Sequence, residues 1–424
     1  MRRAFFLTLL LPLLLACSRS SSYETLVPAD ATLVAAADGS QLLSDSLTTD
    51  LLLHNLKDCG IDLQQPLLAF QTREGNQCVT VAVSDQARLQ KALEQLAGVP
   101  MKDENGLLWG KTASEHPLQI VLSDQALLLM KPAPEQGEKR LKRTALALFQ
   151  QEESQQFCQT ERFAALADLQ QTANFYIAPN GLQTLFGTKA DVVNALLPEG
   201  LALRDFIADG TAQLNPTCAC IDLQLHGQNE QANAFLDSLF SALQRPLEGR
   251  FISQSKPTDD FWLGISADGK RLWQQLKPLR QMALAAEQSS GLDLQALVEG
   301  ISGDLTLCGN LPADSLQANM PLALFAQMRS GSAAAPSKTI SLGQNSLRLQ
   351  PLGSDLAVTM SGTAAKALPQ PRQWQAALPE TPLFLMLRGE ALSQFVPQNL
   401  PLQLDLLTLS LAPERTFRIQ IHTQ

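Results

Sequence analysis

Four segments of the chain repeat one order of hydrophobic and polar positions: a short apolar run, a turn that ends in glycine, and the start of an amphipathic helix. They begin at Leu33, Phe175, Phe261 and Leu383. The apolar runs predict strands, and the glycine lets the backbone leave a sheet sharply. Asp38, Asn180 and Asp268 can cap the following helix through a side-chain oxygen, whereas Arg388 of the fourth copy cannot.

Between these repeats, alternating patterns predict hairpins, and apolar residues at helical spacing predict further helices. The hairpins cover 118–130 and 348–360, and the helices cover 138–150, 161–171, 189–197, 231–244 and 292–299. Strands that are joined largely by hairpins and mixed with helices indicate the α+β fold class, with antiparallel sheets and packed helices. We expect this fold to be built from the recurring strand–glycine–helix unit. The repeat also predicts two related halves, at 25–209 and 210–424.

The first sixteen residues have the pattern of a cleavable secretion signal. Arg2 and Arg3 supply a positive start, and Ala4 to Ala16 are almost entirely apolar. This stretch is shorter than the roughly 20 apolar residues that a membrane-spanning helix needs, and no later stretch reaches that length uninterrupted. We therefore expect residues 1–16 to be removed and the mature chain to begin at Cys17.

The sequence Leu-Leu-Ala-Cys at 14–17 resembles a lipobox, the processing site of bacterial lipoproteins. The resemblance implies cleavage before Cys17, diacylglycerol on its sulfur and an acyl chain such as palmitate on its amine. Each buried CH₂ contributes about 0.8 kcal/mol, so two or three acyl chains anchor a protein almost permanently. The alternative is an ordinary secretory peptide that ends near a cysteine. Residues 17–24 are expected to form a lipidated flexible tether.

The residues behind Cys17 favour a location in the cell envelope. Ser18, in place of aspartate, resembles lipoproteins that are sorted to the outer membrane. Lipoproteins exported to the cell surface of some bacteria carry acidic residues directly behind the lipidated cysteine, whereas the first acid here is Glu24. We therefore expect an outer-membrane lipoprotein on the periplasmic face rather than on the cell surface.

Composition narrows the range of partners. Without the signal the chain has 408 residues and a net charge of −11, so it is a poor nucleic-acid binder, because phosphate neutralisation needs a clustered basic face. The basic run at 139–143 is interpreted as the solvated face of a helix. Four Trp and two Tyr residues count against a surface that stacks on sugars.

The remaining cysteines are permitted to form disulfides in an oxidising envelope, with fifteen connectivities open. They are Cys59, Cys78, Cys158, Cys218, Cys220 and Cys308. Cys218 and Cys220 share one strand face about 7 Å apart, which is too far to bridge without distortion. His226 lies about 20 Å from Cys220 along the strand, and His54, His116 and His422 have no ligand spacing, so no metal site is expected.

Two patterns in the sequence bear on catalysis. Ser253 and Lys256 match the Ser-x-x-Lys pattern, but Pro257 disfavours the helical geometry that this chemistry needs. The acidic pairs at 103–104 and 259–260 are interpreted as solvated turns, although such pairs can serve glycoside hydrolysis. The sequence therefore predicts no catalytic and no cofactor-binding residues.

Two stretches resemble an uncharacterised lipoprotein family, known as domain of unknown function 4836. One is Tyr-Glu-Thr-Leu-Val-Pro-Ala-Asp-Ala-Thr-Leu-Val at 23–34, and the other combines 301–307 with Met-Pro-Leu at 320–322. The resemblance extends over nearly the whole mature chain. It implies a membrane-anchored envelope protein of unknown role and supplies no catalytic residues.

These features predict a non-enzymatic envelope lipoprotein that binds or scaffolds another envelope component. Its partners are the membrane, through lipid on Cys17, and an envelope protein, but not nucleic acid. The alternative is a periplasmic hydrolase that acts on cell-wall or glycan substrates through carboxylates. Buried carboxylates in a deep cleft favour the enzyme, whereas a flat apolar surface or an exposed sheet edge favours binding.

Overall fold

The computed structural model forms two compact units, a first unit at Met1–Ala178 and a second unit at Pro179–Gln424, and each is described by itself. Predicted residues Cys17, His54, His116 and Lys256 lie outside the part that the structure describes. That part comprises residues 22–44, 59–95, 98–113, 117–134, 136–187, 190–215, 217–243, 245–254, 259–275, 293–310, 322–330, 337–342, 345–360, 380–388, 404–412 and 415–423.

The first unit is built on antiparallel strands whose pairings run in the order β8, β1, β2, β3, β7, β6, β5, β4. The strands are β1 (Leu33–Ala37), β2 (Leu67–Gln71), β3 (Gln77–Ala82), β4 (Lys102–Glu104), β5 (Leu107–Lys111), β6 (Gln119–Leu122), β7 (Ala126–Lys131) and β8 (Ala173–Ile177). β6 and β7 are buried on both faces, which explains why their sequences are continuous apolar runs.

Short helices surround these strands in the first unit. Helix α4 inserts Leu89 and Leu93 into the core that also contains Ile120 and Leu127. Both leucines are fully buried, and their spacing of four residues places them on one helical face. The helical segments are η1 (Tyr23–Leu26), α2 (Gly39–Ser44), α4 (Gln86–Gln95), α5 (Glu138–Gln150), η3 (Glu153–Gln155), η4 (Phe157–Gln159) and α6 (Glu161–Ala167).

Asp38 caps helix α2 as the sequence pattern indicated. Its carboxylate accepts hydrogen bonds from the backbone N–H groups of Ser40 (2.9 Å) and Gln41 (3.2 Å) and from the Ser40 hydroxyl (2.6 Å). The Ser40 hydroxyl is the main cause of a pKa below the ordinary aspartate value, and partial burial opposes it. The carboxylate therefore stabilises the helix start in its ionised form.

Replacing Asp38 with alanine is expected to lower the free energy of unfolding by about 1 kcal/mol at pH 7. Because the folded-state pKa of Asp38 is lowered, its contribution is present above the unfolded-state value and is lost on acidification below about pH 4. Urea unfolding at pH 7 and at pH 3 measures both effects. A difference between wild type and variant that stays constant over this range would contradict the cap.

The glycine in the repeated unit is required by close packing rather than by a left-handed turn. Gly269 begins helix α10 (Gly269–Gln275) directly after a strand, and a Cβ atom there would lie 1.8 Å from the Val298 carbonyl oxygen. At Gly39, a Cβ atom would lie 3.1 Å from the Leu67 side chain. Neither glycine has a positive φ angle. In these two copies, the glycine thus marks a helix start that approaches its neighbours closely.

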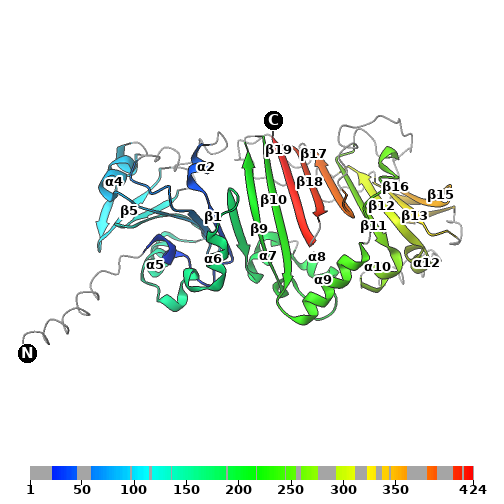
Figure 1. Cartoon of the computed structure of the whole chain (residues 1–424), viewed down its shortest axis with the longest axis horizontal. Helices are drawn as coiled ribbons and strands as arrows, with labels where there is room; N and C mark the ends of the chain where they lie inside the picture. Colours follow the sequence, from blue (N-terminus) through cyan, green and yellow to red (C-terminus); the bar gives the residue numbers. More distant parts are fainter. Residues whose placement is uncertain are drawn as a thin grey trace, which may run out of the picture. The chain divides into compact units, whose positions relative to one another are not determined.

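The second unit is a longer antiparallel array whose pairings run in the order β9, β10, β19, β18, β17, β11, β12, β13, β16, β15, β14. The C-terminal strands β17 to β19 lie between β10 and β11 (Figure 1). The strands are β9 (Phe206–Asn215), β10 (Cys218–Gly227), β11 (Phe261–Asp268), β12 (Ile301–Gly309), β13 (Leu322–Met328), β14 (Lys338–Leu342), β15 (Asn345–Leu352), β16 (Asp355–Met360), β17 (Leu383–Arg388), β18 (Leu404–Ala412) and β19 (Thr416–Thr423).

One face of β11 to β16 carries the main core of the second unit. Trp262, Phe384 and Phe325 are buried there under a segment that contains Leu247 and Phe251. The helical segments of this unit are α7 (Pro179–Phe186), α8 (Ala190–Leu196), η6 (Leu203–Asp205), α9 (Glu230–Ala242), η7 (Ile252–Gln254), α10 and α12 (Leu294–Glu299). Among the described helices, none is long and apolar enough to cross a membrane.

Two buried aspartates hold the segment around Leu247 on the sheet. Asp304 is 1% exposed, and its carboxylate accepts hydrogen bonds from the backbone N–H groups of Glu248 (3.1 Å) and Arg250 (2.9 Å). The Arg250 guanidinium pairs with the buried carboxylate of Asp355 at 2.7 Å. Asp355 also accepts a hydrogen bond from the Met328 backbone at 3.2 Å. Both charges are therefore compensated by specific donors, as buried carboxylates require.

The α+β class with packed helices, expected from the sequence, is wrong. In the part of the chain that the structure describes, nineteen antiparallel strands dominate, and the helices are short, with 13 residues in α5 and α9. Local sequence patterns do not predict these pairings, because strands such as β10 and β19 lie far apart in the chain. For example, the side chains of Gln224 and Thr416, 192 residues apart, are hydrogen-bonded. The expected boundary at 209–210 falls inside β9, and the first unit ends at Ala178.

Candidate functional site

Residues 22–26 are firmly packed in the first unit. Tyr23 and Leu26 of η1 are buried, and the Tyr23 carbonyl accepts a hydrogen bond from the Thr80 hydroxyl of β3. The Thr25 hydroxyl donates to the Ser22 carbonyl at 2.7 Å. Whatever precedes Ser22 is thus attached to a fixed site on this unit.

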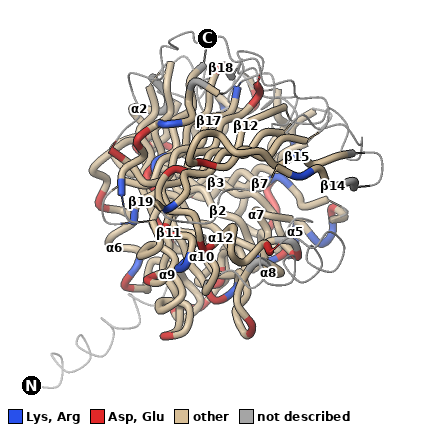
Figure 2. Tube along the Cα trace, turned by 90° about the vertical axis from the view of Figure 1, so that its right-hand side faces the viewer, with Lys and Arg blue, Asp and Glu red and all other residues tan. Residues whose placement is uncertain are grey.

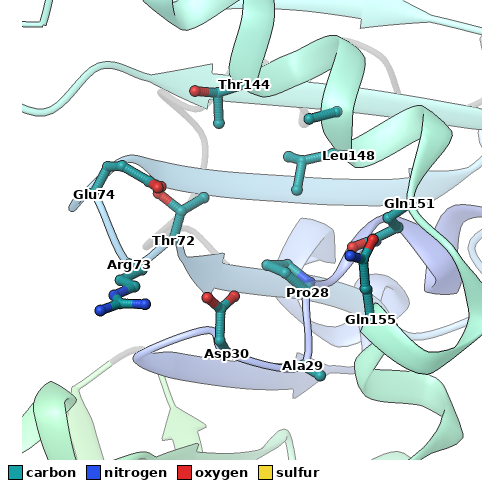
Figure 3. Close-up of a pocket in the computed structure, with 11 residues that line it drawn as sticks. Pro28, Ala29, Asp30, Thr72, Arg73, Glu74, Thr144, Leu148, Gln151 and Gln155 are labelled. Atoms are coloured by element: carbon teal, nitrogen blue, oxygen red, sulfur yellow. The ribbon is translucent and has the colours of Figure 1, made fainter.

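A cavity of about 440 Å³ lies beside this point (Figure 3). Its buried floor includes Pro28, Thr72 and Leu148, whereas Arg73 and Glu74 on the rim are exposed. The lining comes from the loop before β1, the β2–β3 turn, helix α5 and η3. The full lining is Pro28, Ala29, Asp30, Thr72, Arg73, Glu74, Thr144, Ala147, Leu148, Gln151 and Gln155.

Hydrogen bonds fix the walls of this cavity. The Thr72 hydroxyl accepts from the backbone and side-chain N–H groups of Asn76, which closes the β2–β3 turn. The Gln155 carbonyl accepts from the Ala29 N–H at 2.7 Å, and the Gln151 amide donates to a backbone carbonyl of η1. Gln151 and Gln155 lie next to each other, opposite Arg73 (Figure 3). These contacts hold the cavity walls in place, and the Thr72 hydroxyl already serves as an acceptor within the protein.

The second unit carries a continuous apolar surface on the sheet face opposite the Trp262 core. Register partners on neighbouring strands form rows that cross the sheet. One such row, which contains Ile221 of β10 and Leu263 of β11, is apolar on all ten strands that it crosses, from β9 to β15. Of the residues in this row, the eight that are only half-buried and not alanine are here called the apolar face. They are Ile221, Ile419, Leu409, Leu385, Leu263, Leu307, Leu324 and Val358.

The row two residues further along the strands is also apolar. Among the described positions of these two rows, from β9 to β15, no side chain is charged. The second row contains Leu214, Ala219, Ile421, Leu407, Leu387, Phe261, Gly309 and Leu322. Elsewhere along the chain, both signs of charge are interspersed (Figure 2).

Helices cover one border of this surface. The Phe240 ring of α9 lies 5.9 Å from the Phe417 ring of β19, and Leu272 of α10 packs near Ile265. Leu297 of α12 packs near Leu305. Val358, at one end of the apolar face, packs against the same cluster as Leu297, whereas the other seven residues of the face belong to neither of these clusters. All eight keep part of their area accessible. A half-buried apolar area of this extent is typical of a binding surface.

The predicted chemistry at Cys218 and Cys220 takes a different form in the structure. Their Sγ atoms lie only 3.6 Å apart, closer than the strand spacing suggested. Burial raises the pKa of Cys218 to about 11, and the adjacent Cys220 thiol adds to the shift. His226 pairs instead with Asp209 at 2.7 Å, while His422 is the register partner of Cys218. Sequence reasoning missed this neighbour because it lies on a distant strand.

Within the described part of the chain, no disulfide joins the other cysteines. Cys78 is buried in the first unit, and burial raises its pKa. Cys158 is half-buried, and burial is the main cause of its raised pKa. Within the described residues, no group of three or more His, Cys, Asp or Glu side chains is placed to hold a metal ion.

The acidic and basic motifs mainly have structural partners. The Asp103 carboxylate accepts from the Gly106 N–H in the β4–β5 turn, and Glu104 pairs with Lys142 of the basic run at 3.0 Å. In the other acidic pair, Asp259 is buried, and the backbone N–H of Asp260 donates to the Gly309 carbonyl. The pair at 103–104 thus lies at a turn of the first unit, and the pair at 259–260 lies directly before β11 of the second unit. Ser253 lies in η7.

The chain was compared with protein families, curated proteins and solved structures. No protein-family model matches the chain, and no curated protein matches it. Crystal forms I, III and IV of TP0453 are similar, with 12%, 14% and 12% sequence identity and TM-scores of 0.32, 0.32 and 0.31. The matches cover 52%, 53% and 47% of this chain and 86%, 88% and 79% of TP0453. The likeness to domain of unknown function 4836 stays a prediction.

Proposed function

We propose that this protein is an envelope lipoprotein whose second unit binds the acyl chain of an amphiphile. Lipid on Cys17 anchors it at the outer membrane, on the periplasmic face. The single observation that carries the binding role is the apolar face, a half-buried and uncharged surface on the described strands. The sequence-based prediction left the ligand unknown, and the proposal names its chemical class, an amphiphile with an acyl chain.

The anchor and the fold support a position next to lipid. Four residues separate Cys17 from Ser22, so their Cα atoms are five residue steps apart, which an extended chain spans in at most about 18 Å. Since η1 is packed into the first unit, that unit is held close to the membrane surface. An amphiphile that leaves the bilayer therefore meets this protein at high local concentration.

The chemistry of the apolar face favours an acyl chain over a peptide. A peptide that extends a sheet needs unpaired backbone groups at an edge, whereas Leu409 and Ile419 lie on strands paired on both sides. The available contacts are therefore side-chain methyl groups. A flexible acyl chain can follow such a surface, and burial of about ten methylenes contributes about 8 kcal/mol before the cost of immobilisation.

A charge placed on the apolar face is expected to prevent binding. Leu409→Glu should weaken the binding of a fluorescent sixteen-carbon fatty acid by at least about tenfold, because the carboxylate would be buried against the chain. Thr408→Glu is the matched control, since residue 408 lies one position away on the opposite sheet face. Titration of the soluble protein without its anchor gives both dissociation constants.

The milder variant Leu409→Ser keeps the test valid if the glutamate variant unfolds. Circular dichroism and thermal unfolding identify the variants that remain folded. Weaker binding by folded Leu409→Ser, with unchanged binding by Thr408→Glu, supports the proposal. Equal affinity of wild type and Leu409→Ser for the fatty acid overturns the proposal. So does a loss of affinity that is equal in Leu409→Ser and Thr408→Glu.

A further inference from the structure

A pair of thiols lies on the sheet face opposite the apolar face. Cys218 and Cys220 are both half-buried on β10, with their Sγ atoms 3.6 Å apart. Their neighbours in the register are polar: Gln213 and Gln420 lie on either side of Cys220, and Asn215 and His422 lie on either side of Cys218. The pair is therefore a compact dithiol on a polar part of the second unit.

The backbone of β10 opposes a disulfide between these thiols. Residues two apart on a strand have Cα atoms about 6.6 Å apart, close to the upper limit of about 6.8 Å for disulfides. β10 is hydrogen-bonded to β9 and β19 on its two sides, which prevents local bending at Cys218. A disulfide would also have to bring the sulfurs from 3.6 Å to about 2.05 Å.

Binding of a metal ion by the two thiolates requires less movement of the sulfur atoms and of the backbone than a disulfide does. Metal–thiolate bonds are about 2.3 Å long, so two sulfurs on one ion lie up to about 4.6 Å apart. Rotation about the side-chain bonds of Cys218 and Cys220 is enough to reach this separation from 3.6 Å. The paired strands would hold the two ligands in place without movement of the backbone.

The number of ligands selects the ion. Zinc prefers four ligands, whereas among the described side chains no group of three is placed to hold a metal. Copper(I) is soft, prefers thiolates and accepts two of them in a nearly linear arrangement. We propose that Cys218 and Cys220 form a two-thiolate binding site for copper(I).

Binding involves no change of oxidation state. One copper(I) ion forms two Cu–S bonds, and the two thiols release two protons, which leaves a complex with a single negative charge. Arg418 pairs with Asp222 two residues along the same strand face, at 2.8 Å. This ion pair is neutral overall and adds no net charge beside the complex. The site is independent of the apolar face, since side chains on the two faces alternate.

Anaerobic titration of the reduced soluble protein against a chromophoric copper(I) chelator tests the site. We expect one copper(I) per chain to be retained, with an ultraviolet thiolate-to-copper band. Cys218→Ser and Cys220→Ser should each lower the affinity by more than about 100-fold, because one sulfur alone cannot form the chelate. Cys158→Ser removes a half-buried thiol elsewhere and should have no effect.

Several outcomes would overturn the site. These are wild-type affinity in Cys218→Ser, an equal loss in Cys158→Ser, and failure of the wild type to retain the ion. Recovery of a Cys218–Cys220 disulfide in the protein isolated from cells would also contradict it. Circular dichroism of each serine variant shows that a loss of binding does not arise from unfolding.

Discussion

Replacing Cys17 with alanine is expected to move the protein from the membrane fraction into the soluble envelope fraction almost completely. The variant lacks the thiol to which diacylglycerol attaches, and each acyl methylene withdrawn from the bilayer removes about 0.8 kcal/mol of attachment. Fractionation after a high-salt wash measures the distribution. The mass of the N-terminal peptide shows whether residues 1–16 have been removed, so that an uncleaved signal is not mistaken for an anchor.

Ser18→Ala is the matched control for this experiment, because it keeps Cys17 and should stay lipidated and membrane-bound. A processed Cys17→Ala protein that still sediments with membranes would show a second attachment. That result would contradict the single lipid anchor. It would leave the acyl-binding role of the apolar face to be judged by its own titration.

The largest loss of stability is expected from Asp304→Ala. Its buried carboxylate accepts two backbone hydrogen bonds that hold the segment around Leu247 on the sheet. Hydrogen bonds to a charged group contribute about 1.5 to 3 kcal/mol each, so we expect the free energy of unfolding to fall by about 3 kcal/mol. Urea unfolding of the soluble protein, followed by tryptophan fluorescence, measures the change near Trp262.

Asp237→Ala provides the control for Asp304→Ala. Asp237 pairs with Arg415, and the two side chains are 60% and 51% exposed. Exposed ion pairs contribute about 0 to 1 kcal/mol, so this variant should lose far less stability. Equal losses in the two variants would mean that the Asp304 contacts do not hold the Leu247 segment in place.

Local structure could be predicted from the sequence where one segment carries its own signal. Helix α5 has the predicted bounds 138–150, because apolar Leu141, Ala145 and Leu148 recur at helical spacing. The predicted hairpins correspond to β6–β7 and β15–β16. The fold class was wrong, since the pairing of β17 to β19 between β10 and β11 depends on partners far away in the chain.

The candidate sites, too, could be predicted only where one segment carries the signal. Alternation along 219–225 predicts an apolar strand face, but only the register shows that Ile221, Ile419 and Leu409 form one row. The cavity of the first unit joins segments around Pro28, Thr72 and Leu148, which no local pattern links. The distance between the Cys218 and Cys220 sulfurs depends on side-chain rotation, which the strand spacing does not determine.

The most direct test of the acyl-binding role is the lipid content of the protein isolated from envelopes. Organic extraction and mass spectrometry of the Cys17→Ala protein, which has no covalent lipid, should recover about one noncovalently bound amphiphile per chain. The double variant with Leu409→Glu should yield none, while the double variant with Thr408→Glu should match Cys17→Ala. Absence of lipid from folded Cys17→Ala protein, or equal lipid in the Leu409→Glu variant, would contradict the account.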